Sequence, residues 1–173
     1  MEQRGISVAV LVAVLVALGV AGGIVYYVLT LGYGTTLTPA REIAGTWQTP
    51  FPTTFYIQTD FQTGELQNVG TEERVVTWVI TEGSSENSVN IKQTFTVSSR
   101  NLVSGSGYVP DVSPSFFQGI ISGSRLTVMS GSRIVGEFSF TSYTIQGTWD
   151  DSWSMVYSQR VYTSTNGLVL HKM

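Results

Sequence analysis

The chain has 173 residues, a net charge of −3 and a pI near 5.0. This charge balance excludes a general basic surface, so we expect no nucleic-acid partner. Apolar residues make up 42% of the chain, which is enough for a packed core and excludes a disordered chain. Cysteine is absent, and this excludes disulfides, thiolate metal sites and cysteine nucleophiles.

The N-terminal part of the chain is a long apolar run, with no charged residue between Ile6 and Thr30. A helix needs about 20 residues to cross a bilayer, and this run is long enough. Apolar side chains lie on every side of such a helix, as expected for contact with lipid, and Tyr26 and Tyr27 suit the far interface. The run therefore predicts one transmembrane helix over 6–31, with membrane lipid as its partner.

The orientation of this helix depends on the charges that flank it. Arg4 precedes the run, and no further charge follows until Arg41. Because positive charge favours the cytoplasmic side, we expect the N-terminus in the cytoplasm and the C-terminal domain outside. The sequence thus predicts a single-pass protein of the cell membrane.

Small residues occur together inside the predicted helix. Gly19 and Gly23 have the G-x-x-x-G spacing, and Gly22 lies beside them. This spacing lets two helix backbones approach closely within a membrane. Glycine is also common in membrane helices in general, so the sequence leaves open both a packed helix and a lone helix.

The residues Arg4-Gly5-Ile6-Ser7 stand directly before the apolar helix. They resemble the processing site of archaeal type IV pilins and related surface proteins. In that family a prepilin peptidase cuts after the glycine, and the helix stays on the mature protein. The resemblance implies a cytoplasmic leader over 1–5. Bacterial pilins carry Glu at the fifth mature position, where this chain has Val10. An uncleaved anchor with a short basic tail is the alternative.

The part of the chain after the helix has a different pattern. Residues 32–42 are mostly small and polar, which predicts a linker to a domain over 43–173. In that domain the apolar period changes to two, as expected for strands with one buried and one wet face. Strands are predicted over 53–59, 74–81, 88–99, 118–122, 125–130, 133–140, 143–149, 152–163 and 168–172.

Turn signals separate these strands. Ser-Gly-Ser-Arg occurs at 122–125 and again at 130–133, and glycine supplies the positive φ that tight hairpins need. Asn166-Gly167 predicts a hairpin turn, and the polar residues 150–152 predict another turn. About eight or nine short strands joined in this way predict an all-β antiparallel meander, either an up-and-down barrel or a sandwich.

The domain starts with Gly45-Thr46-Trp47, and Gly147-Thr148-Trp149 repeats this pattern near its end. The first copy resembles the Gly-x-Trp start of lipocalin-like (calycin) barrels. In that family the tryptophan closes one end of the barrel, so the resemblance implies this role for Trp47, with Trp149 as an echo. A sandwich with a buried tryptophan beside a glycine fits the same residues.

Residues for catalysis or metal binding are scarce. His171 is the only histidine and lies near the C-terminus, so neither a Ser-His-Asp arrangement nor a histidine metal site is expected. We therefore predict no enzyme activity, no cofactor and no metal. Phe116 and Phe117 are adjacent and cannot both be buried on one strand face. One of the two rings is expected at an interface or across a barrel mouth.

These features together predict a non-enzymatic, membrane-anchored surface protein. The preferred hypothesis is a pilin-like subunit whose helix packs with copies of itself or with partner helices, in the membrane or in an extracellular filament, while the β domain faces outside. One alternative is a membrane-tethered, lipocalin-like module that binds an apolar small molecule. The other is a single-span accessory subunit of a membrane protein complex, docked through Gly19 and Gly23.

Overall fold

The computed structural model describes residues 38–60, 64–104, 114–154 and 160–173. In these residues the chain forms one short helix and nine strands. Their bounds are α2 (Pro39–Ile43), β1 (Gly45–Gln48), β2 (Thr53–Thr59), β3 (Gln67–Glu82), β4 (Ser88–Leu102), β5 (Ser115–Ser122), β6 (Arg125–Ser130), β7 (Arg133–Phe140), β8 (Thr144–Ser154) and β9 (Arg160–Lys172).

The predicted transmembrane helix over 6–31 and the predicted leader over 1–5 lie outside the described residues. Within the residues that are described, no helix combines the length and the apolar character that a membrane span requires.

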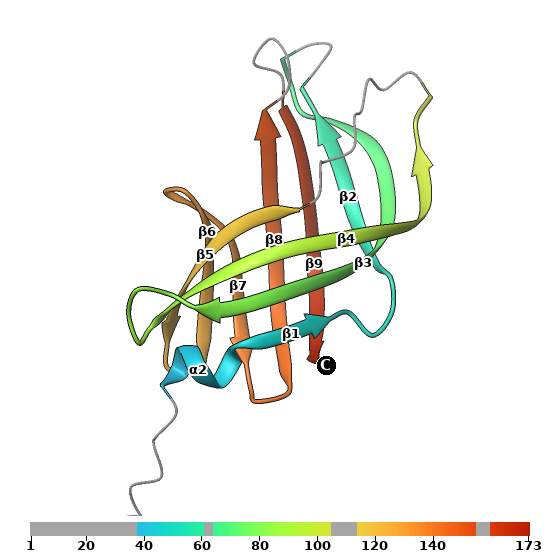
Figure 1. Ribbon diagram of the computed structural model, residues 1–173. Coiled ribbons are helices and arrows are strands. Elements are labelled where there is room, and N and C mark those ends of the chain that lie inside the picture. The colour runs from blue at the N-terminus through green and yellow to red at the C-terminus, as the bar shows by residue number, and fades with distance from the viewer. Residues whose placement is uncertain (1–37, 61–63, 105–113, 155–159) are drawn as a thin grey trace, which may run out of the picture. The chain divides into compact units, whose positions relative to one another are not determined.

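The described strands belong to one antiparallel sheet that closes into a barrel (Figure 1). Eight strands, β2 to β9, follow one another around the barrel in chain order, and β9 pairs with β2 to close the ring. This arrangement confirms the predicted all-β antiparallel meander. Of the two predicted architectures, the sheet forms the up-and-down barrel.

The remaining strand, β1, lies between the same two neighbours as β2. It pairs with one end of β3, and Trp47 and Gln48 also pair with β9, whereas β2 pairs farther along both of these strands. Pro50 and Pro52 separate β1 from β2, and proline has no N–H to donate to a sheet ladder. β1 and β2 therefore lie one after the other in the same place between β3 and β9. A bend separates them, and Phe51 is exposed at this bend.

Inward-facing side chains form one apolar core, and four aromatic rings meet within it. The ring centroid of Trp78 on β3 lies 5.1 Å from that of Phe138 on β7 and 5.7 Å from that of Trp149 on β8. Phe117 on β5 is 5.0 Å from Trp149. The Trp78 indole N–H donates to Gln93 Oε1 at 2.7 Å. Because β3 and β7 lie on opposite sides of the ring of strands, these contacts extend across the barrel interior.

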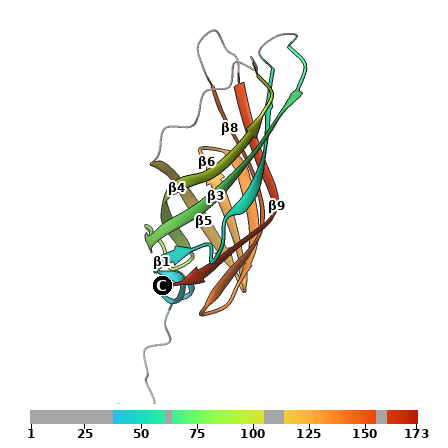
Figure 2. The same cartoon turned by 90° about the vertical axis from the view of Figure 1, so that its right-hand side faces the viewer.

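One end of the barrel is covered by α2 (Figures 1 and 2). Thr38 caps this short helix. Trp47 is fully buried next to it, and the Trp47 indole N–H donates to the carbonyl oxygen of Ile43 at 2.7 Å. Lys172 Nζ lies 5.3 Å from the centre of the Trp47 ring and donates to the carbonyl oxygen of Glu42 at 2.9 Å. Residues at the end of the predicted linker thus form the lid of this end.

The opposite half of the barrel contains fewer strands. β4 pairs with β5 only as far as Gln93, and β8 pairs with β7 only as far as Trp149. Beyond these residues the described parts of β4, β3, β2, β9 and β8 continue without β5, β6 and β7, as Figure 1 shows. The barrel is therefore a complete ring near α2 and a curved, open sheet farther away.

Several local predictions are confirmed. The strands over 53–59, 125–130 and 133–140 have the predicted bounds. The two Ser-Gly-Ser turns are also present, with φ of 57° at Gly123 and 61° at Gly131. Only glycine adopts such angles at little cost, which explains its place in both turns.

Two predicted turns are wrong, because both segments lie inside strands. Asn166 and Gly167 belong to β9, where the pairing with β8 shifts register beside them. They form a bulge with an extra residue on β9 and not a hairpin. Residues 150–152 continue β8 and pair with β9. The predicted strand over 152–163 therefore combines the end of β8 with the start of β9.

Candidate functional site

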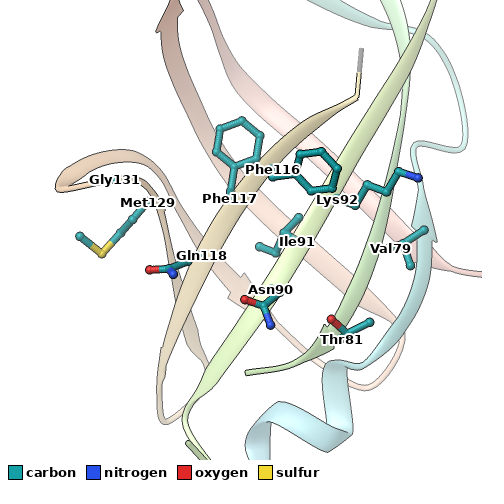
Figure 3. Close-up of a pocket in the computed structure, with 10 residues that line it drawn as sticks. All are labelled: Val79, Thr81, Asn90, Ile91, Lys92, Phe116, Phe117, Gln118, Met129 and Gly131. Carbon is teal, nitrogen blue, oxygen red and sulfur yellow. The ribbon is translucent and has the colours of Figure 1, made fainter. Parts of the chain in front are cut away.

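The candidate site is a groove of about 600 Å³ on the outside of the barrel, over β3, β4 and β5 (Figure 3). The end of β6 and the turn after it form one side of the groove. The side chains that line its outer face are Val79, Thr81, Asn90, Lys92, Phe116, Gln118 and Met129.

The strand register explains why these side chains meet. Val79 on β3 is opposite Lys92 on β4, and Lys92 is opposite Phe116 on β5. One row along, Gln118 is opposite Met129 on β6. Because side chains alternate between the two faces of a strand, residues that are paired across strands lie on the same face. Segments far apart in sequence thus contribute to one continuous outer surface.

Several apolar side chains are exposed on this surface of the barrel. Phe116 is 70% exposed, whereas the adjacent Phe117 is 6% exposed and lies in the core. Val79, Ile120 and Ile134 are also exposed. Exposed apolar side chains that gather on one face of a protein are a common feature of contact sites. One of the two adjacent phenylalanines was expected to be exposed, and Phe116 is the exposed one.

Among the described residues that line the groove, Lys92 is the only charged one. Lys92 is exposed and lies between Val79 and Phe116. Lysine buries its aliphatic stem against neighbouring apolar atoms and keeps the ammonium group in water. The groove is therefore suited to an apolar surface that carries an acidic or carbonyl group at its edge.

A second cluster lies on the inner side of the long strands, beyond the aromatic rings. Glu72 on β3 is fully buried and accepts from Arg74 Nε and from Arg100 Nε, each at 2.8 Å. The Arg74 guanidinium is itself buried and lies 4.9 Å from the ring centre of Phe55 and 4.3 Å from that of Phe95. A buried carboxylate needs such partners, because its desolvation is costly.

A further ion pair lies where β8 extends past β7. Arg133 Nη2 donates to Asp151 Oδ1 and to the carbonyl oxygen of Ser152. In this part of β8 no described strand pairs on the β7 side. Arg133 therefore makes hydrogen bonds to polar groups of β8 at a place where a longer β7 would otherwise have bonded to this strand.

The predicted site residues are distributed over several places. Trp47 lies at the α2 end, Trp149 and Phe117 in the aromatic core, and Phe116 in the outer groove. The structure thus brings Trp149 and Phe117 together, whereas Trp47 and Phe116 lie elsewhere. The predicted processing and helix-packing residues lie outside the described part of the chain; they are Arg4, Gly5, Ile6, Ser7, Gly19, Gly22 and Gly23.

Sequence reasoning missed the cluster around Glu72 and the participation of Val79, Lys92 and Met129 in the groove. A signal for the cluster is present in the sequence, because Glu72 and Arg74 are two residues apart and precede the inward-facing Val76. That spacing places both charges on the buried face of the strand. The groove has no comparable signal, since its residues come from separate strands.

No protein-family model, curated protein or solved structure matches this chain. Among the described residues, no group of three or more His, Cys, Asp or Glu side chains is placed to hold a metal ion.

Two alanine substitutions test the placement of the adjacent phenylalanines. Phe117→Ala should lower the free energy of unfolding by about 3–5 kcal/mol, because it opens a cavity in the aromatic core. Phe116→Ala should change it by less than about 1 kcal/mol, because this ring is largely in water. Chemical denaturation of the full chain in a nonionic detergent measures both values. Equal losses for the two variants would contradict the placement of Phe116 in an outer groove.

Two neighbouring carboxylates test the buried cluster in the same way. Glu72→Gln removes the charge that compensates Arg74 and should cost about 3–5 kcal/mol of stability, as expected when one partner of a buried ion pair is lost. Glu73 faces the other side of β3, and among the described residues its side chain accepts from the Thr54 hydroxyl alone, so Glu73→Gln should cost about 1 kcal/mol or less. A Glu72→Gln variant as stable as the Glu73→Gln control would show that the buried pair is not required.

Proposed function

We propose that this chain is a non-enzymatic, membrane-anchored surface subunit of the pilin-like type, whose barrel contacts further copies of the chain outside the cell. The helix over 6–31 is the proposed anchor, and the outer groove is the proposed contact surface of the barrel. The observation that carries this proposal is the exposed apolar groove over β3, β4 and β5.

The barrel interior favours this proposal over a lipocalin-like binding function. A pocket for an apolar small molecule typically needs about 300 Å³ or more of continuous space. At the level of Trp78, Phe138 and Trp149, the rings contact one another across the barrel. The apolar surface that remains open to a second molecule is on the outside, around Phe116 and Val79.

The chemistry of the groove suits a protein partner. Aromatic and methionine side chains are enriched in protein interfaces, and Phe116 and Met129 both line the groove. Polar neighbours such as Asn90 and Gln118 can bond to a partner at the rim. Burial of the apolar side chains contributes about 25 cal/mol for each Å² removed from water.

The proposed anchor supports assembly in a second way. An apolar helix over 6–31 must bury its surface against lipid or against similar helices, so it holds many copies on one membrane or in one filament. The chain enters the barrel at Thr38, next to the end that α2 covers. Contacts between barrels then need only modest intrinsic affinity, because tethered copies have a high effective concentration.

Self-association of the full chain in nonionic detergent tests this function, with sedimentation velocity over a range of concentrations as the measurement. The wild-type chain should associate reversibly, and Phe116→Ser should weaken association by roughly tenfold, as for loss of a central aromatic contact. Phe51→Ser is the matched control, because Phe51 is 77% exposed outside the groove. It should associate like the wild type.

The proposal would be contradicted if both serine variants associate as strongly as the wild-type chain. The intact mass of protein from its native membrane tests the pilin-like part separately. Loss of residues 1–5 is expected, and a retained leader would leave an anchored subunit that no prepilin peptidase processes.

A further inference from the structure

The outer groove is one end of a longer surface on the outside of β3 and β4. Outward-facing side chains alternate with buried ones along both strands, and the register pairs them across the two strands. This surface is named the β3–β4 face. Its members are Glu73, Val75, Thr77 and Val79 on β3, and Lys92, Thr94 and Thr96 on β4.

The two charges of the β3–β4 face lie at its opposite ends. Lys92 is opposite Val79, and Glu73 lies six residues from Val79 along β3. A strand rises about 3.3 Å per residue, so the two charges are roughly 20 Å apart and cannot pair within one molecule. The side chains between them are uncharged, with Val75 opposite Thr96 and Thr77 opposite Thr94.

Neither charge has an ion-pair partner among the described residues. Lys92 is exposed at the groove, where it lies beside Val79 (Figure 3). Glu73 accepts from the neutral Thr54 hydroxyl at 2.7 Å. The arginines nearest to Glu73 on these strands, Arg74 and Arg100, bind Glu72 on the inner side of the barrel. Both ends of the face are therefore able to take a partner of opposite charge.

We propose that two copies of the chain bind each other through their β3–β4 faces, with Lys92 of each copy against Glu73 of the other. A two-fold axis that crosses the face near Thr77 and Thr94 brings opposite ends of the two faces together. The same ion pair then forms twice, because a two-fold interface uses one surface on both copies. This inference rests on the proposed function, and it specifies that the Glu73 end of a second copy enters the groove.

The remaining side chains of the face suit this arrangement. Val79 is 40% exposed, and Phe116, which is opposite Lys92 on β5, is 70% exposed. Both lose contact with water when a second copy covers the groove. The charges set the orientation of the two copies, because the reverse alignment would place Lys92 against Lys92 and Glu73 against Glu73.

Charge reversal tests the contact, with sedimentation velocity of the full chain in nonionic detergent as the measurement. Lys92→Glu and Glu73→Lys should each weaken self-association by roughly tenfold or more, because each places like charges together at both ends of the interface. The double variant Lys92→Glu/Glu73→Lys should associate like the wild type. An equimolar mixture of the two single variants should do the same, because every contact between the two kinds of chain joins opposite charges.

Arg125→Glu and Glu137→Lys are the matched controls. Both residues are exposed on β6 and β7, outside the β3–β4 face, so these variants should associate like the wild type. The proposal is overturned if Lys92→Glu and Glu73→Lys associate like the controls. It is also overturned if the double variant and the mixture are as weak as the single variants.

Phe116→Ser separates this inference from the proposed function. If Phe116→Ser weakens association and the charge reversals do not, the groove still contacts other copies, but the Glu73 end of a second copy is not what enters it. If neither Phe116→Ser nor the charge reversals change association, the inference and the proposed function both fail.

Discussion

The contact of aromatic rings across the barrel is the interaction on which the rest of this structure depends. Trp78 reaches from β3 to Phe138 on β7, and both rings contact Trp149 on β8. A sheet that closes into a ring needs its interior filled at the density of a crystal. Large aromatic side chains from opposite walls of the barrel meet this need.

The unequal lengths of the strands divide the inner face into two chemical environments. Near α2, where the ring is complete, most inward side chains are apolar, and Trp47 is buried beside α2. Farther along, where β5, β6 and β7 have ended, the inward face holds the ion pairs of Glu72 and Asp151. Glu72 and Arg74 are buried there, so their charges depend on each other for the partners that water would otherwise supply.

The fold class could be predicted from alternation and turn chemistry, since Gly123 and Gly131 each mark a real hairpin. The same reasoning failed at Asn166 and Gly167, because local sequence does not distinguish a hairpin from a bulge inside a long strand. Barrel closure depends on pairing of β9 with β2, which involves residues about 100 positions apart and leaves no local pattern. The outer groove was predictable only through Phe116, since the register that brings Val79 and Met129 into the same groove follows from tertiary structure.

The central claim is that the outer groove, and not the barrel interior, is the surface that contacts other molecules. Hydroxyl-radical footprinting of the full chain, assembled and dispersed, tests it most directly. The account predicts that oxidation of Phe116 and Met129 falls severalfold on assembly, while Phe51 and Tyr143, which are both 77% exposed elsewhere, react equally in the two states. Unchanged oxidation of Phe116 and Met129, with protection at Phe51 or Tyr143, would contradict the account.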